Sequence, residues 1–334
     1  MPGLHGSADA TRYEETIAPD EAAVTARFVA FLKAATEKRY ATGTRQRFNQ
    51  ARATACVDAE FTVLDGLAAG HRVGLFATPR TYKCWIRFAN ATSLSDKDKD
   101  TRGMAIKVLD VPGGNLTPGV TSQDFILNSH PVMMVGTTKE FLELLEANEA
   151  GGFRRTLYFL SHLKAARIAF ASRANPTSHL DIPYWSTTPY QLGATAVKYV
   201  ARPATAQRSP TPASLTDNYL EEAIRQRLLR EDATFDLLVQ PQVDARRTPI
   251  EDASVEWREQ DAPYVSVARI RIPAQSIDDA AKRTRCEETA FNPWHCLPEH
   301  RPLGGMNRAR REIYAAMAEF RRGSSTRPQA VRTP

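Results

Sequence analysis

The feature that most constrains the fold of this chain is a series of five strand-like segments between residues 56 and 135. No helical pattern interrupts the series, and glycine, proline, aspartate and asparagine residues separate its members. Consecutive strands without intervening helices are typical of antiparallel sheets and barrels rather than of parallel α/β folds. The sequence therefore predicts such a sheet or barrel, which begins with the segments 56–64, 71–77, 84–92, 102–111 and 124–135.

Helical patterns surround the strand-rich region. An apolar stripe follows Pro19-Asp20-Glu21 up to residue 38, which predicts a helix. Thr137 and Glu140 have the spacing of a capping box and predict the start of another. The remaining elements are helices at 153–170, 215–231 and 307–322 and strands at 196–201, 234–243 and 264–273. The expected fold class is α+β.

The chain is expected to form a single domain. With 334 residues, 42% of them hydrophobic, it can bury a sizeable core, and no internal repeat or linker divides it. Small polar residues near both ends predict a flexible segment at 1–18 and a disordered tail at 323–334. One domain over residues 19–322 remains.

Charge and cysteine content argue against several kinds of function. The net charge of +6 is too diffuse to indicate a nucleic-acid partner, no apolar run reaches the roughly 18 residues that span a bilayer, and the first residues lack a secretory signal. The cysteines have neither zinc-ligand spacing nor the density of a disulfide framework. We therefore expect a cytoplasmic protein that acts on a small-molecule substrate. The sequence is also compatible with a homo-oligomer. The cysteines expected to be buried filler are Cys56, Cys84, Cys286 and Cys296.

Several motifs resemble those of a known family. "KDKDTRGMAIKVLDVPG" followed by "QDFILNSHPVMMV" resembles the haem catalase superfamily, and "FNPWHCLPEHRPLGGMNRARREIY" resembles the proximal region of its short, catalase-related bacterial members. "IPYWSTTPYQLGATAVKY" and "VEWREQDAPYVSVARIRIP" lie between them in the expected order. The resemblance covers roughly residues 40–322. It implies an eight-stranded antiparallel β-barrel wrapped by helices, a bound haem b, and no extra C-terminal domain.

The helix at 307–322 carries the expected iron ligand. The resemblance assigns ferric iron to Tyr314, and a phenol with a pKa near 10 needs a group that favours its anion. Arg310 lies four residues earlier on the same face and would stabilise the phenolate. Arg321, seven residues after Tyr314, could meet a haem propionate. The alternative is a solvated basic helix with a half-buried tyrosine.

Three further residues match positions that contact haem in the family. Arg47 and Arg87 match arginines that bind propionates, a task that suits bidentate guanidinium groups. An arginine inside an apolar strand, as Arg87 is, needs a buried anionic partner. Arg47 could instead be a surface residue. Met133 stands where an aromatic side chain usually packs on the porphyrin, and core filler is its alternative role.

The expected distal side departs from the catalase pattern. True catalases carry a histidine three residues after the arginine that matches Arg47, and this chain has Gln50 there, next to Asn49. The hydroxyl residue expected on the next strand is replaced by Ala89, whereas the distal asparagine is retained as Asn128. An amide can donate and accept hydrogen bonds but cannot take the proton that peroxide dismutation moves. Gln50 and Asn128 are the candidate catalytic residues, with Asn49 as the alternative to Gln50.

Two functions follow from the resemblance. The first is a tyrosinate-ligated haem enzyme with little true catalase activity, which acts on an organic hydroperoxide or another O–O or N–O substrate as a peroxidase, isomerase or dehydratase. The second is a non-catalytic haem-binding or sensing protein on a catalase scaffold. A third alternative, independent of the resemblance, is that the basic helix binds nucleic acid. It would give a salt-dependent DNA complex and no haem absorption.

Overall fold

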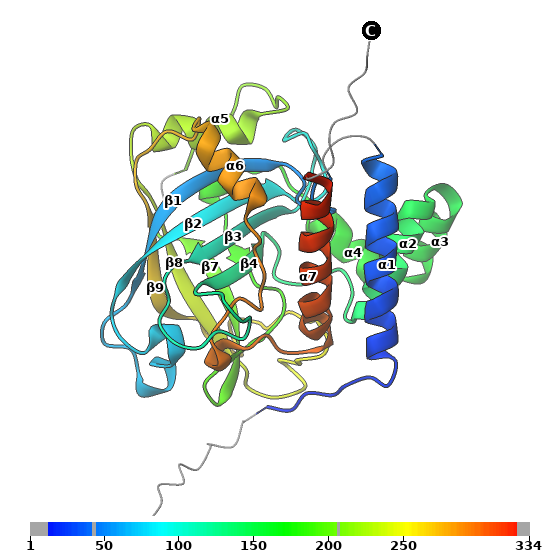
Figure 1. Ribbon diagram of the computed structural model, residues 1–334, viewed down its shortest axis with the longest axis horizontal. Helices are drawn as coiled ribbons and strands as arrows, with labels where there is room; N and C mark the ends of the chain where they lie inside the picture. Colours follow the sequence, from blue (N-terminus) through cyan, green and yellow to red (C-terminus); the bar gives the residue numbers. More distant parts are fainter. Residues whose placement is uncertain (1–12, 42–44, 206–207, 326–334) are drawn as a thin grey trace, which may run out of the picture.

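A computed structural model describes residues 13–41, 45–205 and 208–325. Its centre is a closed antiparallel β-barrel (Figure 1). Eight strands form the ring in the order β5-β4-β3-β2-β1-β9-β8-β7, and β5 pairs with β7 to close it. The predicted eight-stranded barrel is confirmed. Its strands are β1 (Ala53–Val63), β2 (Thr81–Asn90), β3 (Arg102–Val108), β4 (Gln123–Asn128), β5 (Tyr184–Trp185), β7 (Thr195–Pro203), β8 (Ala233–Pro241) and β9 (Val265–Ile272), and β6 (Tyr190–Leu192) pairs with β7 outside the ring.

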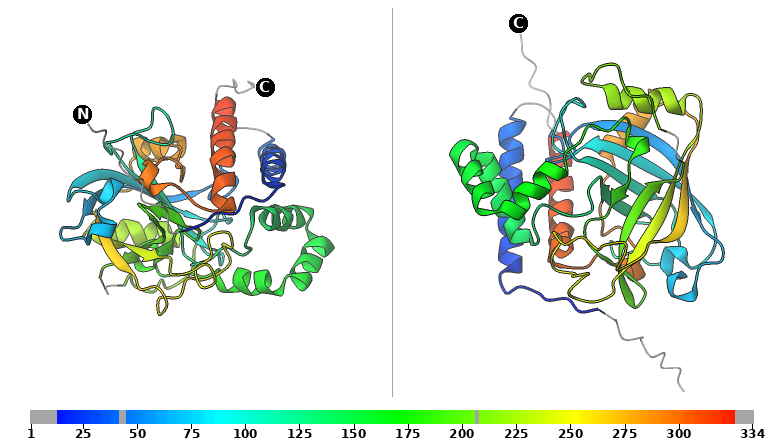
Figure 2. Two further views of the ribbon diagram at one scale, coloured as in Figure 1. Left: turned by 90° about the horizontal axis from the view of Figure 1, so that it is seen from below. Right: turned by 180° about the vertical axis from the view of Figure 1, so that it is seen from behind.

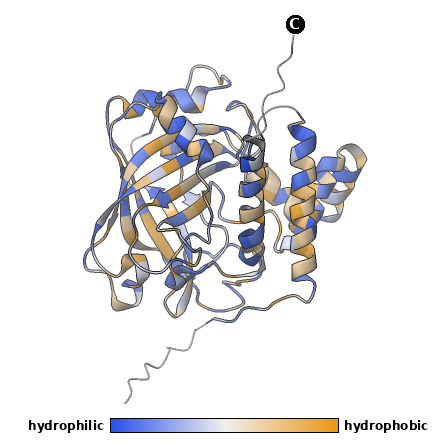
Figure 3. Cartoon of the chain, in the orientation of Figure 1, coloured by the Kyte–Doolittle hydropathy of each residue, from blue (hydrophilic) through white to orange (hydrophobic). Residues whose placement is uncertain are grey.

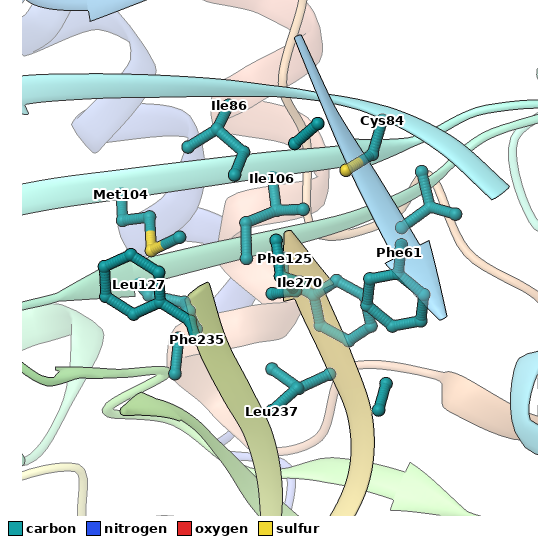
Figure 4. Packing of buried hydrophobic residues seen from close by; sticks show 14 of the residues in the cluster. Phe61, Cys84, Ile86, Met104, Ile106, Phe125, Leu127, Phe235, Leu237 and Ile270 are labelled. Atoms are coloured by element: carbon teal, nitrogen blue, oxygen red, sulfur yellow. The ribbon is translucent and has the colours of Figure 1, made fainter. Parts of the chain in front are cut away.

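The interior of the barrel is filled by apolar side chains. Phe61 of β1 stacks on Phe125 of β4 with ring centroids 5.9 Å apart, and Ile106 and Leu237 are fully buried in the same cluster (Figure 4). Side chains alternate across each strand, so every second residue joins this core. A closed barrel of eight strands leaves room inside for little more than its own side chains. The interior therefore has no room for a ligand as large as haem.

The helices lie around the barrel. Helices α1 (Glu21–Arg39) and α7 (Gly305–Ser325) contact each other side by side next to the barrel (Figures 1 and 2). Figure 3 shows hydrophilic residues along α7 beside the more hydrophobic strands. The other helices are α2 (Thr138–Ala150), α3 (Gly152–Ser161), α4 (Leu163–Ala171), α5 (Tyr219–Leu228) and α6 (Ala280–Glu288), with short 3-10 turns η1 (Ala69–His71), η2 (Gly74–Phe76), η3 (His179–Asp181) and η4 (Pro298–His300).

Two predicted elements were wrong. Residues 71–77 form parts of η1 and η2 instead of a strand, because Gly74 takes a positive φ of 52° and a Cβ there would collide with His300. The helix predicted at 153–170 is two helices, because His162 has non-helical dihedral angles between α3 and α4. The capping box of Thr137 and Glu140 is confirmed at the start of α2.

Described residues near both ends of the chain contact the rest of the protein or continue its helices. In the segment predicted to be flexible, Tyr13 donates to Gln191 at 2.8 Å, and Glu15 forms ion pairs with Arg301 and Arg308. Helix α7 continues to Ser325. The predictions for residues 1–12 and 326–334 lie outside the described residues. Over the described ranges, no helix is both long and apolar enough to cross a bilayer.

Candidate functional site

Two predicted arginines meet a single carboxylate that the sequence did not indicate. Arg87 projects from β2 and donates to Glu287 Oε1 from Nη2 at 3.1 Å. Arg47 pairs with the other oxygen, Oε2 of Glu287, and also donates to the carbonyl of Thr289 at 2.9 Å. The side chains of Arg47 and Arg87 are 14% and 2% exposed, whereas that of Glu287 is 43% exposed. The carboxylate thus enters the cluster from its solvent side.

The third predicted propionate residue joins the same cluster. Arg321 of α7 donates to the backbone carbonyl of Glu287 at 3.3 Å. Burial and then the charge of Arg47 lower the pKa of Arg87 to about 10, with a smaller contribution from Arg321 and against the opposing effect of Glu287. Burial and then the charge of Arg47 also lower the pKa of Arg321 to about 10. Three guanidinium groups are therefore close enough to repel one another, and another anion would relieve that repulsion.

Gln50 and Asn128 lie together at one end of the strands β2 to β4. Gln50 Nε2 is 3.5 Å from Asn128 Oδ1, a long contact between the two amides. A Cβ on Gly103 of β3 would overlap the Gln50 side chain, so the glycine makes room for it. Gly103 pairs with Ala89 on one side and Asn128 on the other. Asn49 is exposed. The structure therefore brings Gln50, and not Asn49, next to Asn128.

The backbone at Gln50 is held in an uncommon conformation. Its φ of 55° lies in the left-handed region, which is disfavoured for a residue other than glycine. Gln50 N donates to Ala91 O at 2.7 Å, and Arg87 Nη2 donates to Gln50 O at 2.7 Å. Arg87 therefore links the carboxylate cluster to the amide pair. Strained backbone of this kind is concentrated at functional sites.

Helix α7 places Arg310 beside two buried polar side chains, and Tyr314 follows one helical turn later. Arg310 Nη1 donates to Thr188 Oγ1 and to Asn307 Oδ1, each at 3.2 Å. Tyr314 is half-buried. Burial raises the pKa of Tyr190 to about 12, while Arg310 lowers it and Tyr314 raises it, so the three side chains lie within electrostatic reach. The pairing of Arg310 with a Tyr314 phenolate stays a prediction.

Met133, the last of the predicted site residues, and two histidines that precede α7 have varied surroundings. Met133 is half-buried, and its backbone N–H donates to Ala253 O at 3.0 Å. His295 contacts Asp124 at 3.0 Å. The buried His300 accepts from Leu75 N at 2.9 Å, which gives this histidine a structural role.

A disulfide lies beside the carboxylate cluster. Cys56 of β1 is bonded to Cys286 of α6, the residue immediately before Glu287. The expectation that all cysteines are buried filler was therefore wrong for this pair, whereas Cys84 and Cys296 are free and buried. The bond attaches the end of α6 to the barrel and so restricts where Glu287 can lie. A disulfide is uncommon in a reducing cytoplasm, and this pair weighs against the predicted location.

The structure brings most of the predicted site residues into three groups. Arg47, Arg87 and Arg321 form the first, Gln50 and Asn128 the second, and Arg310 and Tyr314 the third. The sequence did not indicate Glu287, Thr188 or Asn307. One signal was present for the first of these, because a buried strand arginine requires an anion, although nothing in the sequence located it.

The comparisons with known proteins agree with the fold. No protein-family model and no curated protein matches the sequence. Three similar solved structures are a bacterial catalase (TM-score 0.69, 16% identity, 100% of this chain and 66% of that one), catalase A from Saccharomyces cerevisiae (0.68, 16%, 88% and 65%) and a fungal catalase (0.67, 15%, 89% and 64%).

The chain has the fold of these catalases. It spans about two thirds of the length of the catalases that it matches, and these share only 15–16% of their residues with it. Structural similarity at such low identity establishes the architecture alone. It does not establish the activity, because one fold supports different chemistries at its sites. The resemblance predicted from the sequence motifs is confirmed at the level of this fold.

Proposed function

We propose that this protein binds haem b between α7 and the barrel wall and that Tyr314 would hold its ferric iron. The observation that carries the proposal is the cluster of Arg47, Arg87 and Arg321 next to α7. Burying guanidinium groups together is unfavourable unless anions compensate them. Two haem propionates are anions of suitable charge, and bidentate arginine contacts suit carboxylates.

The donor set on α7 fits the other end of the same group. Tyr314 and Arg321 are seven residues apart, about two helical turns, so both project from one side of α7. The phenol oxygen is a hard donor that suits ferric iron, and Arg310 one turn earlier supplies a positive charge that favours its anion. One helix would thereby fix both the iron ligand and a propionate contact. Met133 is proposed to pack on the porphyrin.

On the distal side we propose that Gln50 and Asn128 orient the substrate through hydrogen bonds. Haem bound through a phenolate supplies redox chemistry at iron toward O–O or N–O bonds. The amide of Gln50 donates and accepts hydrogen bonds, but it cannot hold a proton in transit as a histidine does. Ala89, which pairs with Gly103 beneath Gln50, offers no hydroxyl group. This favours an organic hydroperoxide or another O–O or N–O substrate over efficient dismutation of hydrogen peroxide.

The same amide pair supports a second candidate, a non-catalytic haem-binding or sensing protein. The arginine cluster and Tyr314 would serve either function equally well. Stopped-flow mixing of the ferric protein with hydrogen peroxide and with an organic hydroperoxide separates the two. A shift of the haem Soret band with the organic hydroperoxide, at a rate well above that with hydrogen peroxide, is expected for the enzyme. A Soret band that neither reagent changes would refute the enzyme and favour the sensor.

A further inference from the structure

The outer side of α3 and α4 exposes an unusual amount of apolar surface. Phe153 and Phe170 are 80% and 86% exposed, and the three leucines between them are more than half exposed. Large apolar side chains gathered on a surface usually mark a site of interaction. We call the exposed apolar set the α3–α4 face, and it consists of Phe153, Leu157, Leu160, Leu163 and Phe170.

Helical spacing places these residues on the outward side of each helix. Phe153, Leu157 and Leu160 follow the i, i+4, i+7 pattern along α3, and Leu163 and Phe170 are seven residues apart around α4. The opposite side of the helix pair faces the protein, where Tyr158, Phe159 and Ala165 pack against Val135 and Leu144. Figure 1 shows α3 at the edge of the molecule, farther from the barrel than α1 and α2. The face is thus free to meet a partner.

The α3–α4 segment itself is basic, although Glu140 and Glu143 of α2 and Asp252 lie near its inner side. No aspartate or glutamate occurs between residues 150 and 180, and the five lysine and arginine residues there are all exposed. Four of them form no side-chain hydrogen bond or ion pair with any residue of the described ranges, whereas Lys164 donates to Ser254 Oγ at 2.6 Å and lies 4.0 Å from Asp252 Oδ2. The basic residues are Arg154, Arg155, Lys164, Arg167 and Arg173.

We propose that the α3–α4 face binds peripherally to the surface of an anionic lipid bilayer. Exposed phenylalanine and leucine on one side of a helix, with arginine and lysine beside them, is the arrangement that places a helix in the membrane interface. The basic side chains would contact lipid phosphates while the apolar ones enter the acyl boundary. A second copy of this chain fits less well, because its own basic face would repel this one. The helices lie on the bilayer and do not cross it.

Co-sedimentation of the full chain with vesicles tests the proposal. Phosphatidylcholine vesicles with and without phosphatidylglycerol supply the neutral and the anionic surface, and added salt tests the electrostatic part. We expect binding to the anionic vesicles that salt weakens, and little binding to the neutral ones. Failure of the wild-type chain to bind anionic vesicles would overturn the proposal, whatever the result of the haem experiments.

Matched variants locate the contact. Phe153→Ser with Phe170→Ser, and separately Arg154→Glu with Arg155→Glu, should each lower the partition onto anionic vesicles by about tenfold or more. Leu229→Ser, at a 60% exposed leucine outside this face, is the control and should bind as the wild type does. Unchanged binding of both double variants would refute the assignment. So would a wild-type dimer in lipid-free solution that the phenylalanine variant abolishes, because the face would then be a subunit interface.

Discussion

Replacing Glu287 by glutamine tests the electrostatic core of the site. The glutamine keeps the shape of the side chain but removes the charge that Arg47 and Arg87 share. Arg87 is almost completely buried, so it cannot turn to water for compensation. The repulsion between the guanidinium groups would then be unopposed at this point. The folded state should therefore be destabilised.

The magnitude follows from the contacts of the carboxylate. Buried charge-assisted hydrogen bonds contribute about 1.5–3 kcal/mol each. The Glu287 side chain is 43% exposed, so solvent screens both contacts, and we expect a total loss of about 2–3 kcal/mol in the free energy of unfolding. An unfolding entropy of about 2.1 cal/mol/K per residue gives about 0.7 kcal/mol/K for 334 residues, so the loss corresponds to a fall of about 3–4 °C in Tm.

Differential scanning calorimetry of the haem-free variant provides the measurement. Glu288→Gln is the matched control, because Glu288 is the next residue, is exposed and belongs to no ion pair among the described residues. Its Tm should stay within about 1 °C of the wild type. Equal Tm values for the two variants would show that Arg47 and Arg87 do not depend on the carboxylate, and the reasoning about a cation-rich site would fail.

Three further predictions concern the distal amide, a buried histidine and the disulfide. Gln50→His should raise hydrogen peroxide turnover, measured as oxygen release by the haem-loaded protein, and the exposed Asn49→His should not; no gain in the first would place Gln50 away from the substrate. Burial lowers the pKa of His300 from 6.5 to about 3, so between these pH values only the unfolded state binds a proton at this histidine. The urea concentration at the unfolding midpoint should therefore decrease as the pH is lowered from about 6.5 to about 3, and a midpoint that does not change with pH would contradict this. Dithiothreitol should cost the wild type about 2–5 kcal/mol of stability and leave the double variant Cys56→Ser, Cys286→Ser unaffected, and equal sensitivity would refute a stabilising bond.

The barrel could be predicted because its signal is local. Alternating apolar residues and turn residues mark each strand, and a succession of strands without helices leaves few arrangements. The segment 71–77 shows where this logic fails. Its buried residues Leu75 and Phe76 pack into the core from the short 3-10 turn η2. The contact of Gly74 with His300, more than 200 positions away, is not visible in the sequence.

The site could be predicted only in part, for the same reason. Tyr314, Arg310 and Arg321 lie on one helix, so their spacing reveals a common face. Glu287 and the disulfide partners depend on contacts between distant segments, because Cys56 and Cys286 are separated by 230 positions. In the sequence nothing distinguishes Glu287 from an ordinary solvated acid, and no helix was predicted there. Only the closed barrel brings it to Arg47 and Arg87.

The absorption spectrum of the purified protein, with a pyridine haemochrome assay, tests the central claim most directly. The wild type should carry haem b and show a high-spin ferric spectrum with a phenolate ligand. Tyr314→Phe should lose that spectrum, whereas Tyr219→Phe, a tyrosine whose hydroxyl donates to Pro176 O away from the arginine cluster, should keep it. A wild-type protein that takes up no haem, or a Tyr314→Phe spectrum identical to that of the wild type, would contradict the account.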